Sequence, residues 1–165
     1  MKKRIAMFVL AAVVVVFLGL QLDRPAMNNS NDQSKHLSTL YPLPDSVASI
    51  LTVACYDCHS NNTRHPWYYQ IQPVGRWLSG HIQDGKKDLN FSEFASYRPR
   101  RQYRKLEQAA ELIKENKMPI SSYTIMHKEA VLTETQKNLL YTWTAATRDS
   151  MKAIFPPDSL KGRKR

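Results

Sequence analysis

The sequence predicts a small all-α domain with a long irregular loop region, preceded by an apolar N-terminal helix. Residues 5–22 form an 18-residue apolar run interrupted only by Gly19 and Gln21. Three later segments repeat apolar residues at helical spacing, and no segment shows the two-residue alternation of a convincing strand. Residues 60–99 are rich in Pro, Gly, Asn and aromatic side chains, which is typical of loops and short turns.

The N-terminal run is long enough to cross a membrane. As a helix it would extend about 27 Å, close to the hydrocarbon thickness of a bilayer. A cleaved signal peptide ends in small residues, whereas this run ends with Leu18, Leu20, Leu22 and Arg24. We expect residues 1–22 to be a membrane anchor, with a signal peptide as the alternative. The basic residues 2–4 predict a cytoplasmic N-terminus. The domain would then face the periplasm from the bacterial inner membrane, or be released there if the leader is cleaved.

Composition divides the rest of the chain into three parts. Residues 23–40 are rich in Asn, Ser, Asp and Gln and predict a flexible linker. Residues 41–150 form the folded domain, and residues 151–165 form a basic tail in which Pro156 and Pro157 end the ordered structure. Residues 2–4 carry three charges of the net +10 and residues 161–165 carry four, which leaves +3 for residues 5–160. A modest charge on an exported domain argues against nucleic acid as a partner.

Three helices are expected in the domain. The first follows Pro44 and Asp45 and runs into the cysteine motif, the second runs from about Arg100 to Lys117, and the third follows a capping box at Thr133 and Gln136. Their predicted buried faces are Val47, Ile50, Leu51 and Ala54 in the first, Tyr103, Leu106, Ala110 and Ile113 in the second, and Leu139, Leu140, Trp143 and Ala146 in the third.

The two cysteines of the chain lie in the motif Cys55-Tyr56-Asp57-Cys58-His59. Cys-x-x-Cys-His is the attachment signature of c-type haem. Cysteines three residues apart face the same side of a helical turn, where each thiol can add to a haem vinyl group. The adjoining His59 then supplies an imidazole ligand to the iron. The motif predicts one covalently bound haem c per chain, held by Cys55, Cys58 and His59.

Three other uses of the cysteines are weaker. A thioredoxin-like thiol oxidoreductase needs a strand before the motif, and the pattern here is helical. A structural zinc site needs four ligands, and the remaining histidines lack zinc-finger spacing. A disulfide between Cys55 and Cys58 would close a very small loop and contribute little stability.

The second axial ligand has several candidates. Met118, followed by Pro119, lies between the second and third helices, and a thioether raises the potential of a haem relative to a second histidine. His81 is the next candidate, in a tract ending with the turn signal Asp84-Gly85. The stretch of Met126 and His127 ranks third. His65 is too close to His59 along the chain, and His36 is expected to be solvated in the linker.

The motif and two later segments resemble the bacterial haem-binding domain family with a single Cys-x-x-Cys-His. The segments are C-Y-D-C-H-S-N-N-T-R-H-P-W-Y-Y, then H-I-x-x-G-x-x-x-L-N-F-S-E-F, then K-M-P-x-x-x-Y-x-x-x-H. The resemblance covers residues 40–148 and implies a cytochrome c-like fold with haem on Cys55, Cys58 and His59. The segment after Met118 is similar to the last third of class I cytochromes c, although its connection to Thr133 is longer than usual there.

Other side chains are expected to shape the haem site. Arg76 is a candidate partner for the haem propionates. The basic cluster of residues 98–105 is expected to be a solvated helix face that could guide an acidic partner. The aromatic residues expected to pack around the haem are Trp67, Tyr68, Tyr69, Trp77 and Phe91.

With both axial positions filled by the protein, a haem transfers single electrons. The sequence therefore predicts a membrane-tethered monohaem cytochrome c, a carrier rather than an enzyme, with redox proteins at the membrane as partners. The alternatives are a ligand sensor or enzyme with an open or displaceable sixth iron site, and a thiol oxidoreductase without haem. A di-haem peroxidase is disfavoured because the chain has one attachment motif.

Overall fold

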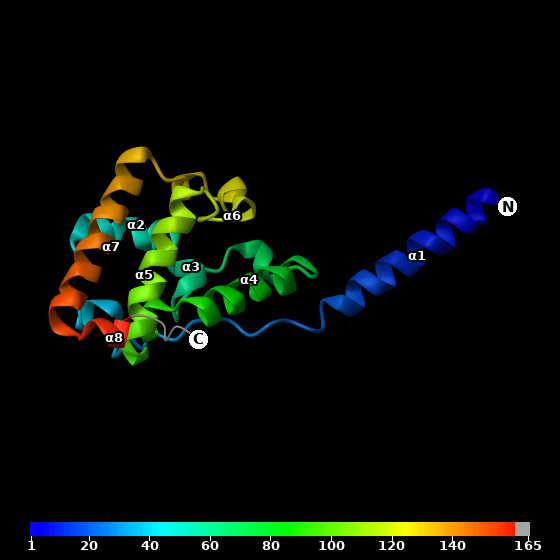
Figure 1. The fold of residues 1–165 in the computed structure, drawn as a ribbon. Helices are drawn as coiled ribbons and strands as arrows, with labels where there is room; N and C mark the ends of the chain where they lie inside the picture. The colour runs from blue at the N-terminus through cyan, green and yellow to red at the C-terminus, as the bar shows by residue number, and fades with distance from the viewer. Residues whose placement is uncertain (161–165) are drawn as a thin grey trace.

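A computed structural model describes residues 1–160, and this part of the chain is all-α (Figure 1). Its only β-type pairing there is an isolated bridge between Asn29 and Asn62. The basic residues Lys161, Arg163, Lys164 and Arg165 of the predicted tail lie outside the described residues. The helices are α1 (Lys2–Leu20), α2 (Asp45–Ala54), α3 (Tyr56–His59), α4 (Val74–Asp88), α5 (Pro99–Lys114), α6 (Ser121–Met126), α7 (Glu134–Ile154) and α8 (Pro157–Leu160).

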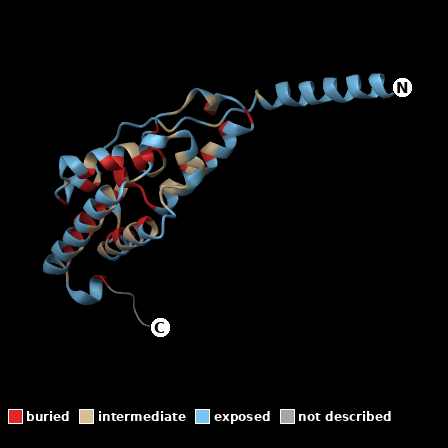
Figure 2. Ribbon diagram, turned by 90° about the horizontal axis from the view of Figure 1, so that it is seen from above, coloured by how far each residue is buried: buried red, intermediate tan, exposed pale blue. Residues whose placement is uncertain are grey.

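Helix α1 projects away from the rest of the molecule (Figures 1 and 2). None of its residues is buried. It is long and apolar enough to cross a membrane, with a mean hydropathy of 2.3. An apolar helix exposed on every side matches a membrane anchor or a signal sequence and does not match a core helix.

The core lies where α2, α5, α7 and α8 meet. Helix α2 buries the four predicted residues Val47, Ile50, Leu51 and Ala54. Helix α5 packs along α7 and buries Leu106 and Ile113 against it. The fully buried side chains of this core include Phe94, Leu37, Leu106, Leu140 and Met151.

The capping box of α7 is confirmed, but its predicted buried face is partly wrong. Thr133 and Gln136 cap each other's backbone N–H groups at the start of the helix. Leu139 and Ala146 are exposed. The buried face is instead Leu140, Trp143, Thr144, Thr147 and Met151. The two threonines suit this face because their hydroxyls donate to carbonyl oxygens one turn back, those of Leu140 and Trp143.

Residues 60–99 contain a 15-residue helix, α4, where sequence patterns indicated only loops and turns. The predicted turn at Asp84-Gly85 was wrong because both residues lie inside this helix. Gly85 is there for a close approach: a Cβ on it would lie 2.6 Å from the carbonyl oxygen of Cys58. The glycine therefore lets α4 pack directly on α3.

Both segments that flank the predicted domain pack against it. In residues 23–40, Leu37 is fully buried, and the Asn28 side chain donates to the carbonyl oxygen of Ser60 at 2.9 Å. His36 is not solvated, because its Nε2 lies 3.1 Å from the hydroxyl of Tyr56. The expected end of ordered structure at Pro156 was also wrong: α8 begins at Pro157 and buries Leu160 against the core.

Candidate functional site

The Cys-x-x-Cys-His motif occupies the junction of α2 and α3. Cys55 ends α2, and the single turn of α3 follows at once, with His59 N–H bonded to the Cys55 carbonyl at 2.9 Å. Both cysteines and His59 are half-buried. The predicted helical turn therefore exists, and it is held between α2 on one side and α4 on the other.

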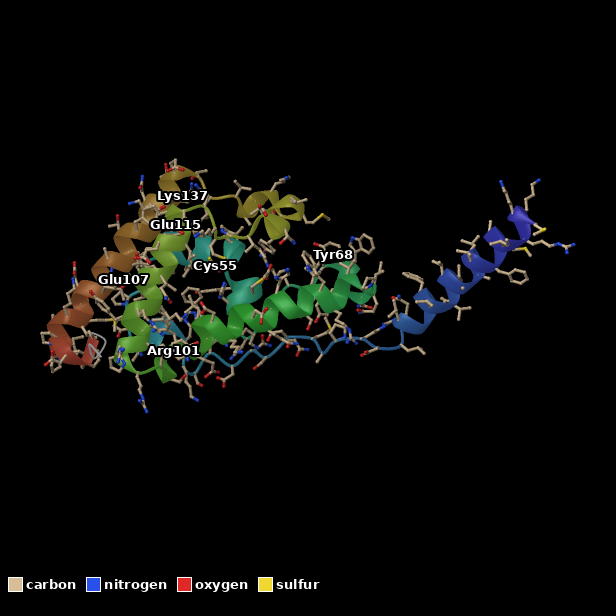
Figure 3. All side chains as sticks on the ribbon, turned by 45° about the vertical axis from the view of Figure 1, so that its right-hand side comes forward. Cys55, Tyr68, Arg101, Glu107, Glu115 and Lys137 are labelled. Atoms are coloured by element: carbon tan, nitrogen blue, oxygen red, sulfur yellow. The ribbon has the colours of Figure 1, made fainter. Side chains whose placement is uncertain are left out.

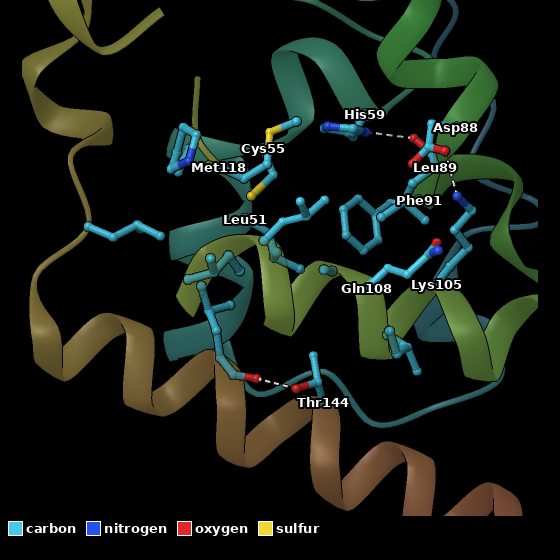
Figure 4. Close-up of a pocket in the computed structure, with 18 of the residues that line it drawn as sticks. Leu51, Cys55, His59, Asp88, Leu89, Phe91, Lys105, Gln108, Met118 and Thr144 are labelled. Carbon is cyan, nitrogen blue, oxygen red and sulfur yellow. Dashed lines mark hydrogen bonds and ion pairs between the residues drawn. The ribbon is translucent and has the colours of Figure 1, made fainter. Parts of the chain in front are cut away.

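The imidazole of His59 has a fixed orientation. Its Nδ1 lies 2.8 Å from the carbonyl oxygen of Leu89, the first residue after α4 (Figure 4). A carbonyl can only accept, so Nδ1 carries the proton and donates. This bond selects the tautomer in which Nε2 has a free lone pair, the usual arrangement of a histidine that binds a metal.

Two adjoining pockets open at this imidazole. The first has a cavity volume of about 70 Å³ and is lined by Cys55, His59 and Met118 together with apolar side chains of α2, α5 and α7 (Figure 4). The second, of about 260 Å³, is lined by the same three residues and also by Cys58 and His81. The structure thus brings Cys55, Cys58, His59 and Met118 to one space.

Met118 reaches this space because α5 ends abruptly just before it. Asn116 has a φ of 54°, and its N–H bonds to the carbonyl of Ile113 while that of Lys117 bonds to the carbonyl of Leu112. This pair of bonds is the Schellman ending of a helix. It turns the chain back so that Met118 packs against the core at the mouth of the pockets.

The two competing histidines differ in how they are held. Both ring nitrogens of His127 already have partners. Its Nδ1 pairs with Glu129 at 3.1 Å, its Nε2 lies 3.4 Å from the Tyr68 hydroxyl, and its ring stacks on Tyr123. His127 and Met126 line a third pocket that does not include His59. The Nε2 of His81, in contrast, is buried and has no hydrogen-bond partner within residues 1–160. His81 is therefore the alternative to Met118 that lines a pocket with His59.

Burial keeps both cysteines as neutral thiols. It raises the pKa of Cys55 to about 12 and that of Cys58 to about 11. Catalytic thiols of oxidoreductases have lowered pKa values, because the thiolate is the nucleophile. The surroundings of Cys55 and Cys58 therefore argue against redox catalysis by the free thiols.

A buried carboxylate inside the motif anchors the turn, and sequence reasoning missed it. Asp57 accepts from the hydroxyl of Tyr123 at 2.7 Å and from Arg64 through its backbone N–H and its guanidinium. Asp57 raises the pKa of the Arg64 guanidinium, and burial together with Asp57 raises that of the Tyr123 hydroxyl. The available signals were the position of Asp57 between the cysteines and the presence of Tyr123 in the third segment quoted above.

The polar edge of the first pocket is formed by different residues from those expected. Arg76 lines neither pocket; it is exposed near the start of α4 and pairs with Asp23.

Lys105, expected on a solvated face, is 7% exposed and lines the first pocket, with its Nζ 2.5 Å from Asp88 (Figure 4). Gln108 lines the same pocket. Phe91 is also in its wall. Trp67, Tyr68, Tyr69 and Trp77 line the third pocket, together with Cys58 and His81.

The donor set fits a haem. Two thiols on one face of a turn, an imidazole with a free Nε2 and a thioether converge on space walled by aliphatic and aromatic side chains. No curated protein and no solved structure matches the chain. A family model described as a haem-binding domain matches residues 15–146, a range that includes the segment packed before the predicted domain. The chain therefore belongs to the haem-binding domain family and is a haem-binding protein.

Proposed function

We propose that the protein is a membrane-tethered monohaem c-type cytochrome that transfers single electrons on the periplasmic side of the bacterial inner membrane. The observation that carries this proposal is the imidazole of His59. Its Nδ1 is held by the Leu89 carbonyl, and His59 lines the same space as Cys55, Cys58 and Met118. When bound there, haem supplies an iron that cycles between two oxidation states by one electron.

Each residue of the site has a distinct role in this proposal. Cys55 and Cys58 would hold a haem through thioethers to its vinyl groups. His59 and Met118 would both bind the iron, which would close it to substrates and favour a high reduction potential. Lys105 and Gln108 offer the donors that haem propionates need at the edge of an apolar pocket. Asp57, bound by Arg64 and Tyr123, fixes the position of the turn.

The apolar helix α1 supports the tether. It is long enough to span a bilayer, and the basic residues 2–4 before it favour a cytoplasmic N-terminus. The domain after it would then lie in the compartment where c-type haem is usually attached. Redox proteins of the same membrane are the expected partners.

Covalent attachment is tested by expressing the full chain together with a haem-attachment machinery. The pyridine haemochrome spectrum should report one thioether-linked haem per chain, which stays on the protein in a denaturing gel. The Cys55→Ser/Cys58→Ser variant should lose it. Haem that can be extracted from the wild-type protein would refute a c-type site while leaving haem binding intact.

The axial ligand is tested with Met118→Ala and His81→Ala side by side. A ferric absorption near 695 nm, an expectation for methionine ligation in c-type cytochromes generally, should be present in wild type and His81→Ala and absent in Met118→Ala. Only Met118→Ala should bind carbon monoxide rapidly when ferrous. Rapid binding by the wild type would favour the ligand sensor, and loss of low-spin character in His81→Ala alone would assign His81 as the ligand.

A further inference from the structure

An exposed aromatic groove lies on the domain close to the end of α1. It is the third pocket, of about 350 Å³, whose inner end is lined by Cys58 and His81 and whose outer part carries large side chains that face solvent. Trp67 is 78% exposed, Met126 61% and Trp77 52%. We name as the aromatic face the rim residues Trp67, Tyr68, Val74, Trp77 and Met126. A cluster of this kind on a soluble surface marks an interaction site.

The aromatic face is tied to the end of α1 by specific contacts. Gln21 exchanges two hydrogen bonds with the backbone of Gln72, accepting from its N–H at 2.9 Å and donating to its carbonyl at 3.2 Å. Asp23 pairs with Arg76, one residue before Trp77. These contacts explain why the start of α4 lies beside the end of α1 (Figure 1), and Figure 3 shows Tyr68 on the same side of the domain.

Helix length then sets the depth of the aromatic face. The 19 residues of α1 extend about 28 Å, nearly the full hydrocarbon thickness of a bilayer. If α1 spans the membrane, its last turn is at the headgroup level, and Gln21 lies directly beyond it. The start of α4, which Gln21 and Asp23 contact, then lies next to this level.

We infer that the aromatic face docks on the lipid headgroup and upper acyl region of the bilayer that α1 crosses. This inference rests on the tether of the proposed function. Trp and Tyr concentrate in this zone because their rings are apolar at one end and polar at the other. Arg24, beside Gln70, supplies a cation for anionic headgroups. Docking removes two exposed indoles from water and fixes the orientation of the domain on the membrane.

The test uses the full haem-containing chain in nanodiscs of phosphatidylethanolamine and phosphatidylglycerol. Benzoylphenylalanine, a photo-crosslinking residue, replaces Trp67, Trp77, Leu10 in α1, or Ile154, one at a time. Ile154 is the matched control because it is 66% exposed and apolar, yet it lies at the far end of α7. Variants are compared only when their attached haem has the wild-type Soret spectrum, which shows that the domain is folded.

Lipid adducts are expected at positions 10, 67 and 77, with yields at 67 and 77 about tenfold above the yield at 154. Adducts at 10 without adducts at 67 and 77 would overturn the docking while leaving the tether intact. Adducts from 67 and 77 to a protein or to a second copy of the chain would also overturn it. Absence of lipid adducts at 10 would refute the tether itself, and the docking with it.

Discussion

At the residue scale, the buried carboxylate of Asp57 determines how firmly the turn of the Cys-x-x-Cys-His motif is held. Its oxygens receive bonds from Arg64 and Tyr123, which come from a loop and from α6. Leaving a buried acceptor without its donor lowers the free energy of unfolding by more than an average hydrogen bond contributes to it. Asp57 thus joins the motif turn both to the loop that follows it and to the distant helix α6.

Tyr123→Phe should therefore lower the free energy of unfolding by about 1–2 kcal/mol. Urea unfolding followed by circular dichroism measures the change. Tyr141→Phe is the control, because Tyr141 is half-buried and its hydroxyl has no hydrogen bond within residues 1–160. Equal effects of the two substitutions would show that the bond to Asp57 contributes nothing.

His65 should make stability depend on pH. Burial lowers its pKa below the ordinary value of 6.5, and its Nε2 accepts from the backbone N–H of Asn28 at 3.3 Å. Below pH 6.5 the unfolded chain takes up a proton before the folded chain does. The free energy of unfolding contributed by the neutral imidazole is therefore present above pH 6.5 and is lost as the pH falls through the lowered pKa.

We expect the difference in unfolding free energy between pH 7.5 and pH 5.5 to shrink in His65→Gln, since an amide oxygen accepts at either pH. Urea titrations at the two pH values measure it. Burial also lowers the pKa of His36, so His36→Gln should remove a separate and additive part of the dependence. An unchanged difference in both variants would contradict this account.

At the element scale, the contact between α3 and α4 depends on Gly85. An added Cβ would lie 2.6 Å from a backbone oxygen that has no room to move. Gly85→Ala should lower the free energy of unfolding by about 1–3 kcal/mol and shift the haem spectrum, because Cys58 is the residue displaced.

Gly80 provides the control in the same helix. No atom lies within 4 Å of the position its Cβ would occupy. Gly80→Ala should raise the free energy of unfolding by about 0.5–1 kcal/mol through helix propensity. A similar gain of stability at both positions would mean that propensity, and not the close approach to Cys58, governs α4.

The success of sequence reasoning also differs from element to element. Helix α2 was predictable from its apolar stripe, and the start of α7 was predictable from its capping box, because both are local signals. Helix α4 was not, since Gly75, Gly80 and Gly85 weaken its pattern. Gly75 and Gly85 are explained only by tertiary contacts: a Cβ on Gly75 would lie 1.9 Å from the Tyr69 carbonyl. The Cys-x-x-Cys-His motif could be recognised from its residue spacing. The bond of His59 to Leu89 and the burial of Lys105 could not be predicted, because both depend on tertiary contacts.

At the scale of the whole molecule, the two pockets around His59 lie where most helices of the domain meet. Together they are lined by residues of α2, α3, α4, α5 and α7 and of the segment that holds Met118. Small domains have little apolar surface to bury, so a large apolar group in this space contributes strongly to stability.

The haem-loaded protein should therefore unfold at a clearly higher urea concentration than the Cys55→Ser/Cys58→Ser variant. Its transition should also be steeper, because more surface is exposed on unfolding. Circular dichroism at 222 nm gives both midpoints (the usual helix signal). Coincident curves would show that the helices form a complete core without the cofactor.

The packing of residues 23–40 on the domain affects how the domain could meet a partner protein at the membrane. A free chain of this length would let the domain sample a radius of about 23 Å around its anchor. With Leu37 in the core and Asn28 bonded to the Ser60 carbonyl, that freedom is lost. If α1 is in the bilayer, His59 keeps a constant height above it. For the electron transfer proposed above, finding a partner would then be a search in two dimensions, and the partner would have to present its own redox centre at the matching height.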